Sequence, residues 1–256
     1  MPISVDSVLT AIALFAAPFL RLSAMMAVAP VFSAAGFNVR TRALFAVLIA
    51  ALVAPSLPAP PTDSLLSAAG VLMALREIGV GLILGFVMQM AFGAAVFAGQ
   101  AISMTMGLGF AMAVDPQNGV QVPVLSQLYV ILATLLFLAL DGHLMLIAAV
   151  VESYQLIPAG IAGIPVTSLS SVVALGTVVF AGGILLALPA LTALLMINVA
   201  FGIVTRTAPQ LNIFAVGFPV TILAGLLIMF IVMPGFINAL SELITSALTR
   251  GMDALS

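Results

Sequence analysis

The side chains best able to do chemistry in this chain are the few charges inside long apolar stretches. Arg21 lies in the first stretch, and Arg76 and Glu77 are adjacent in the third. A charged side chain in hydrocarbon costs several kcal/mol, so such residues either pair or mark a functional path. Adjacent helix positions point in different directions, so we expect Glu77 to pair with Arg21 rather than with Arg76. Two interpretations remain open: a buried ion pair that fixes helix docking, or part of an ion or proton pathway.

A further charge, Asp141, interrupts the apolar run between residues 125 and 151. Asp141 and Gly142 would place a carboxylate and a poor helix former in the middle of a spanning helix. A bend or hairpin at this point, shielded by protein or reaching water, costs less. We therefore expect the helix to break here, and we group Asp141 with the three charges above as candidate buried charges.

Other kinds of chemistry have little support in the sequence. His143 is the only histidine and the chain has no cysteine, so we expect His143 to be a polar cap at a helix end or at a water interface rather than a metal ligand. There is no phosphate-binding loop motif, and no serine lies in a nucleophile motif with a base. The net charge of −2 argues against a basic surface for nucleic acid. The sequence therefore predicts no enzyme, no cofactor and no metal.

The composition explains which elements must hold these residues. The 256 residues are 64% hydrophobic and include only six Lys or Arg and eight Asp or Glu. A soluble fold of this size cannot hide so much apolar surface, so we predict an all-α polytopic membrane protein with a single membrane domain, 1–256. Internal prolines indicate that several helices are kinked or broken. About six hydrophobic helical segments are expected, at 8–32, 43–61, 68–98, 125–151, 170–204 and 213–240.

The arginines outside these segments predict the orientation of the chain. With six spans, the loops that carry Arg40, Arg42 and Arg206 lie on one side, and only Arg250 lies on the other. Basic loops remain in the cytoplasm, so both termini are expected on the outer side of the membrane.

The segment between the third and fourth runs is apolar but unlike a spanning helix. Gly107 and Gly109 flank Leu108, and Asp115-Pro116 and Asn118-Gly119 are turn signals. Such backbone at membrane depth must be buried in protein or line a cavity. Flexible methionines can seal irregular gaps. The segment is either a mobile plug or an ordinary loop packed on the bundle. Its methionines are Met104, Met106 and Met112, and Gly107 and Gly109 would be the hinges of a plug.

A resemblance decides between these interpretations. The segment RTAPQLNIFAVGFP at 206–219 resembles the signature region of the FliR/SctT family of export-gate membrane proteins in type III secretion. Further stretches match this family in order: GFVMQMAFGAAVFAGQAISMTMGLGFA at 85–111, VDP at 114–116, VPVLSQL at 122–128 and DGHLMLI at 141–147. The similarity covers nearly the whole chain, apart from the termini and the proline-rich turn.

The resemblance implies a fold and partners. Members of this family resemble a fusion of the FliP and FliQ folds, and one copy joins FliP and FliQ in a helical gate in the bacterial inner membrane. The loop matching 103–123 would plug the closed channel. Its apolar seal would be formed by Met104, Met106, Phe110 and Met112, and Gly107 and Gly109 would let the loop swing aside. The turn at 205–212 would be the cytoplasmic contact of FlhB, and FlhA and the flagellar basal body would be further partners. The residues of that turn expected to make the contact are Arg206, Pro209, Gln210 and Asn212.

The function expected from the resemblance is a non-enzymatic subunit of the flagellar type III export gate, which conducts unfolded substrates. A small-solute secondary transporter is the competing class, with Arg21, Glu77, Asp141 and His143 as its only plausible charged groups. Two more functions stay open: a scaffold that lines no path, and the injectisome counterpart of the gate.

Overall fold

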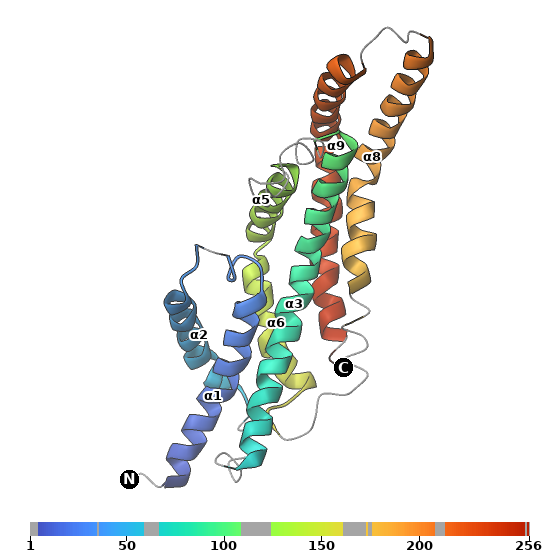
Figure 1. Cartoon of the computed structure of the whole chain (residues 1–256). Helices are drawn as coiled ribbons and strands as arrows, with labels where there is room; N and C mark the ends of the chain where they lie inside the picture. The colour runs from blue at the N-terminus through green and yellow to red at the C-terminus, as the bar shows by residue number, and fades with distance from the viewer. Residues whose placement is uncertain are drawn as a thin grey trace. The chain divides into compact units, whose positions relative to one another are not determined.

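The computed structural model describes residues 5–34, 36–58, 67–108, 124–160, 173, 176–207, 213–253 and 255. Within these ranges the regular elements are all helical (Figure 1). They are α1 (Val5–Val28), α2 (Val39–Val53), the short 3-10 helix η1 (Ala54–Ser56), α3 (Ala68–Thr105), α5 (Val124–Ala139), α6 (Gly142–Leu156), α8 (Gly176–Thr207) and α9 (Ile213–Asp253).

The predicted all-α membrane fold is confirmed. In the described part of the chain, five helical stretches are long and apolar enough to cross a membrane: Thr10–Val28, Val39–Ser56, Ala68–Thr105, Gly176–Thr207 and Gly217–Asp253. Helices α5 and α6 form a bent pair that adds a sixth candidate if it counts as one span. The break between them lies where the sequence predicted it, at Asp141, whose backbone adopts a left-handed conformation with φ of 54°.

Two helices are longer than the sequence indicated. Helix α3 has 38 residues, or about 57 Å, and α9 has 41 residues, or about 62 Å, although about 30 Å crosses the hydrocarbon. Pro219 and Pro234 lie inside α9 and Pro189 inside α8, yet each helix continues through them. Proline removes one backbone donor without ending a helix when its surroundings tolerate the gap, so these helices continue across their prolines instead of being divided by them.

The chain divides into two compact units, so the single membrane domain expected from the sequence has an internal division. The first unit combines Met1–Met90, Leu138–Gly176 and Ile244–Ser256, and the second combines Ala91–Phe137 and Thr177–Leu243. Each unit therefore joins segments that are far apart in the sequence. Helices α3 and α9 each contribute one part to the first unit and another to the second.

In the first unit, helices pack through small residues. Helix α2 buries Ala46 and Ala50, whereas Leu44, Leu48 and Leu52 on its other faces are exposed. Helix α3 approaches α1 at Gly81 and Gly85: a Cβ atom on Gly85 would lie 2.6 Å from the Met25 carbonyl oxygen, and one on Gly81 would strike the Arg21 carbonyl oxygen. The two glycines thus allow backbone-to-backbone contact, as a GxxxG pair does in membrane helices.

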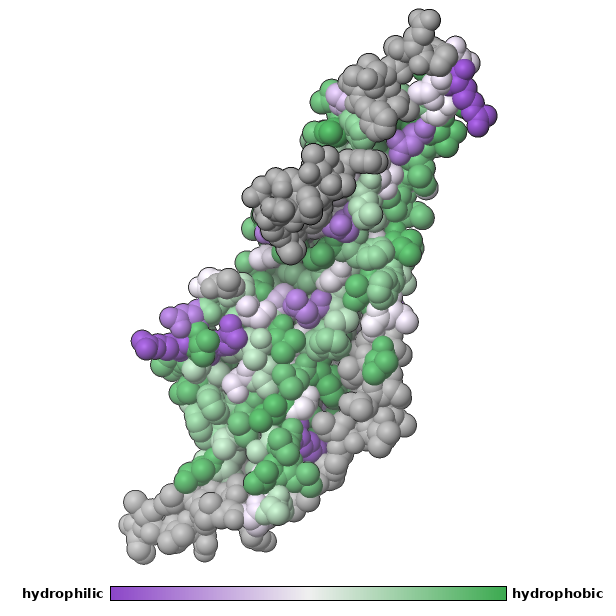
Figure 2. Space-filling model, viewed as in Figure 1, coloured by the Kyte–Doolittle hydropathy of each residue, from purple (hydrophilic) through white to green (hydrophobic). Residues whose placement is uncertain are grey.

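In the second unit, the C-terminal part of α3 packs on α5, α8 and α9. Gly99 lies against α5, where an added Cβ would be 2.7 Å from the Ser126 Cα. Gly183 of α8 faces Phe97 of α3, and the Tyr129 and Phe236 rings of α5 and α9 meet edge-to-face at 4.4 Å. The remaining helix surface is apolar and exposed, and Figure 2 shows a largely hydrophobic face with few hydrophilic patches. Such a surface fits lipid or other protein chains rather than water.

Candidate functional site

A buried ion pair joins α1 and α3 in the first unit. Arg21 Nε lies 2.8 Å from Glu77 Oε2, and Arg21 Nη2 lies 3.0 Å from Glu77 Oε1. Both side chains are 0% exposed. The guanidinium fork and the carboxylate therefore bind through two parallel hydrogen bonds, which is the strongest arrangement for such a pair. The predicted pairing of Glu77 with Arg21 is confirmed.

Helix α6 completes the surroundings of this pair. Tyr154 donates its hydroxyl to Glu77 Oε2 at 2.9 Å, and its ring centroid lies 3.7 Å from Arg21 Cζ. Arg21 also donates to Ser153 Oγ at 2.7 Å and to the Ile157 carbonyl at 3.1 Å. Each ion thus has several partners, and α1, α3 and α6 are joined at one point. This arrangement favours a docking role, because a conducting group needs a partner it can release.

Arg76 lies next to this pair but does not take part in it. Its side chain is 9% exposed, and its Nη1 donates to the Gly160 carbonyl at 3.0 Å. The buried Nε of Arg76 has no hydrogen-bond partner among the described residues. The separation of Arg76 from Glu77 follows from their adjacent helix positions, as the sequence indicated.

Asp141 is exposed, so the expectation of a buried charge at this position is wrong. The physical reason is its place in the chain: Asp141 precedes α6, and its carbonyl accepts the amides of Leu144 and Met145 at 2.8 and 3.0 Å. The break places Asp141 between the two helices, on the surface of the protein. His143 is partly exposed, and its Nδ1 is buried without a partner among the described residues. No group of three or more His, Cys, Asp or Glu in the described part of the chain could hold a metal ion.

The end of α3 contains the first of the predicted seal residues. Gly107 has φ of +84°, its amide donates to the Met104 carbonyl at 3.1 Å, and the Leu108 amide donates to the Ser103 carbonyl at 3.1 Å. This is a Schellman cap with glycine at the position that requires a left-handed backbone. Gly107 therefore ends the helix in a defined geometry, at the position where a hinge was expected.

The two methionines at this end have opposite environments. Met104 is 64% exposed, whereas Met106 is 0% exposed and packs on Gly225 of α9. Met106 is thus a core residue of the second unit, and Met104 is the one of the two that presents its side chain outward. The other predicted seal residues, Gly109, Phe110 and Met112, lie outside the described residues.

The predicted cytoplasmic turn is only partly described. Arg206 lies in the last turn of α8 and is exposed. Its positive charge lies near the helix C-terminus, where the helix dipole favours it. Pro209, Gln210 and Asn212 lie outside the described residues.

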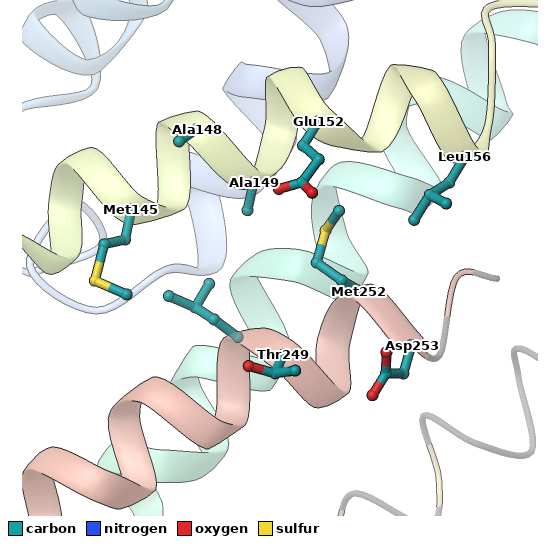
Figure 3. A pocket seen from close by; sticks show the side chains of 9 residues that line it. Met145, Ala148, Ala149, Glu152, Leu156, Thr249, Met252 and Asp253 are labelled. Carbon is teal, nitrogen blue, oxygen red and sulfur yellow. The ribbon is translucent and has the colours of Figure 1, made fainter.

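A cavity in the first unit was not predicted. It has a volume of about 530 Å³ and lies between α6 and the C-terminal end of α9 (Figure 3). Its two carboxylates come from the two helices, Glu152 from α6 and Asp253 from α9. Their sequence positions gave no sign of their proximity, because they are separated by about a hundred residues along the chain. The remaining lining residues are Met145, Ala148, Ala149, Leu156, Leu248, Thr249 and Met252.

Comparison with known proteins places the chain in a family. The family model described as bacterial export proteins, family 1, matches residues 12–247. The flagellar biosynthetic protein FliR of Pectobacterium carotovorum subsp. carotovorum is 40% identical over 217 residues, which cover 85% of this chain and 83% of that protein. FliR of Escherichia coli (strain K12) is 39% identical over 217 residues, which again cover 85% of this chain and 83% of that protein. FliR of Bacillus subtilis (strain 168) is 28% identical over 235 residues, which cover 89% of this chain and 89% of that protein. The chain therefore belongs to the bacterial export protein family 1.

Proposed function

We propose that this chain is a membrane subunit of the flagellar type III protein-export apparatus. The observation that carries the proposal is its identity of 40% with a flagellar biosynthetic protein over 85% of the chain. The all-helical, apolar fold supports a place within the membrane part of the apparatus. In this role the chain is structural rather than enzymatic, and it forms part of the conduit through which unfolded substrates leave the cell.

The proposed conduit is closed by the segment 103–123. The first residues of this segment support the role. Met104 presents a large apolar side chain outward, and the end of α3 that carries it is capped and packs against α8 and α9. An apolar constriction blocks hydrated ions because they cannot shed their water there. Gly109, Phe110 and Met112 are proposed to complete the seal.

The proposed partners are FliP and FliQ, with one copy of this chain in a hetero-oligomeric gate in the inner membrane at the flagellar basal body. Exposed apolar residues along α8 and α9 supply surface for such neighbours, among them Leu185, Leu188, Leu223, Leu227 and Phe230. FlhB is proposed to contact the turn at 205–212, which includes the exposed Arg206. FlhA is a further proposed partner.

A secondary transporter is less well supported. Its candidate charges would have to meet at one substrate site, but Arg21 and Glu77 bind each other and α6. Asp141 is exposed at the break between α5 and α6. The flagellar names of the relatives favour the flagellar apparatus over an injectisome. A scaffold that lines no path would predict that export substrates never crosslink to residues of the 103–123 segment.

The proposal is tested by co-expressing the tagged chain with FliP and FliQ and by measuring the native mass of the purified assembly. A defined hetero-oligomer with one copy of this chain supports the gate. A monomer, with both partners expressed and folded, refutes it. The seal is tested in the assembled gate by deleting residues 109–114, which leaves the α3 cap at Gly107 intact. Ion leakage should rise, and unchanged conductance would refute the seal.

A further inference from the structure

We infer that α8 and α9 form a clasp that holds the end of α3, so that residues through Leu108 are the fixed base of the proposed seal. The clasp consists of Asn198 of α8 and Phe218, Thr221 and Gly225 of α9. The inference rests on the proposed function, because it says which part of the sealing segment stays in place when the conduit opens. It removes Gly107 from the candidate hinges of the seal.

The first step of the argument concerns the last carbonyls of α3. The final carbonyls of a helix have no donor within that helix, and membrane surroundings offer no water in exchange. Asn198 Nδ2 donates to the Thr105 carbonyl at 3.3 Å. The Thr221 hydroxyl lies 3.3 Å from the Met106 carbonyl and 3.0 Å from its own helix's Phe218 carbonyl, and it shares its proton between them. Two neighbouring helices thus cap α3 from outside.

The second step concerns the Met106 side chain. It is fully buried, and a Cβ atom on Gly225 would lie 2.5 Å from its Cε and 2.7 Å from its Sδ. Glycine at 225 therefore leaves a socket in α9 that the methionine fills. Glycine in a helix interior destabilises the helix relative to alanine. The close packing of Met106 against Gly225 offsets this loss of helix stability.

The third step concerns Gly107. Its positive φ suits glycine alone, and a Cβ added there would lie 2.6 Å from the Phe218 Cε1. The Phe218 ring covers the cap on the side where a side chain would project. Backbone geometry, socket and hydrogen bonds all hold the same three residues, Thr105 to Gly107. A hinge at Gly107 would have to break these contacts together.

The experiment measures ion leakage per assembled gate in cells, with a membrane-potential dye and the gate quantified on native gels. Gly225→Ala fills the socket and should raise the leak towards that of a gate lacking residues 109–114. Gly235→Ala is the matched control, because a Cβ at this position of α9 meets nothing within 4 Å. It should leave the leak at the wild-type level.

A second pair of variants keeps the test decisive if Gly225→Ala does not assemble. Thr221→Val removes the hydroxyl without changing shape and should raise the leak about fivefold, the effect expected for one buried hydrogen bond. Its control is Thr192→Val, because among the described residues the Thr192 hydroxyl donates to the Pro189 carbonyl of its own helix, at 3.0 Å, and to no neighbouring helix.

The outcomes separate the clasp from the seal. A leak from the loop deletion together with wild-type tightness of Gly225→Ala and Thr221→Val overturns the clasp and leaves the seal in place. A tight gate after the loop deletion overturns the seal, and the role given to the clasp falls with it. Leakage from the two clasp variants, with tight controls, supports the inference.

Discussion

The ion pair between Arg21 and Glu77 predicts a specific pattern of stability in three variants. Arg21→Met removes the cation and leaves the Glu77 carboxylate buried with only the Tyr154 hydroxyl, at 2.9 Å. Breaking a buried pair in this way costs about 3–5 kcal/mol. Glu77→Gln leaves Arg21 with Ser153, the Ile157 carbonyl and the Tyr154 ring, so its cost should be smaller, about 2–3 kcal/mol.

The double variant Arg21→Met/Glu77→Gln should lose less than the sum of the two single variants. It leaves no unpaired charge, and Ser153 keeps its bond to the Val150 carbonyl at 2.6 Å. The Ile157 carbonyl loses its hydrogen-bond donor, and the new side chains pack imperfectly. Together these effects should lower the free energy of unfolding by about 1–3 kcal/mol. Taking the middle of each range, the coupling energy of the cycle should be about 4.5 kcal/mol, above the range of about 0.5–3 kcal/mol that is usual for residues in contact.

The assay uses the absence of cysteine from the chain. A single cysteine at the fully buried Val80 becomes reactive to a thiol dye only when the first unit unfolds, so its modification reports the folded fraction during a dodecyl sulphate titration in mixed micelles. The exposed Arg206→Met is the control and should change stability by less than about 0.5 kcal/mol. A coupling energy below about 0.5 kcal/mol would refute the reasoning, because independent sites are additive within that margin.

The same helix contacts give three further predictions. Gly81→Ala should destabilise the first unit by about 1–3 kcal/mol in the titration above, because the added methyl group strikes the backbone of α1. Gly235→Ala lies in the second unit, and the same titration with a reporter cysteine in α5 should find it neutral or stabilising. Gly99→Ala should destabilise the second unit by a similar amount, because its Cβ would lie 2.7 Å from the Ser126 Cα; a reporter cysteine in α5 that stays protected would contradict this. Tyr154→Phe keeps the ring over Arg21 and loses one hydrogen bond, so it should cost about 1–2 kcal/mol in the same assay, less than Glu77→Gln.

The sequence predicts features that depend on local chemistry. Apolar runs long enough to span hydrocarbon identified the helices, because length and composition of a run can be judged without knowing what the run packs against. The break at Asp141 followed from one carboxylate and one glycine in an apolar run. The pairing of Arg21 with Glu77 followed from the scarcity of charges and from helix geometry. Helix ends were less predictable: α3 and α9 continue well past the expected limits because the backbone hydrogen bonds of a helix do not stop where its apolar run stops.

The partners that complete each site could not be predicted, because they are distant along the chain. Ser153 lies 132 residues from Arg21, and Tyr154 lies 77 residues from Glu77. Nothing in the pattern of α6 distinguishes these two side chains from other polar groups near a helix end. Only the packing of α6 beside α1 and α3 turns a two-residue ion pair into a network that joins three helices.

The glycines show most clearly where sequence reasoning ends. Gly107, Gly225 and Gly235 are the same residue in similar apolar surroundings, and the sequence pattern does not distinguish what each one does. In the structure the first supplies a left-handed cap, the second a socket for Met106, and the third meets nothing in this chain. The difference depends on the facing helix and not on the glycine. A glycine predicted to be a hinge can therefore be the most rigid point of a segment, and in the proposed gate the base of the seal is such a point.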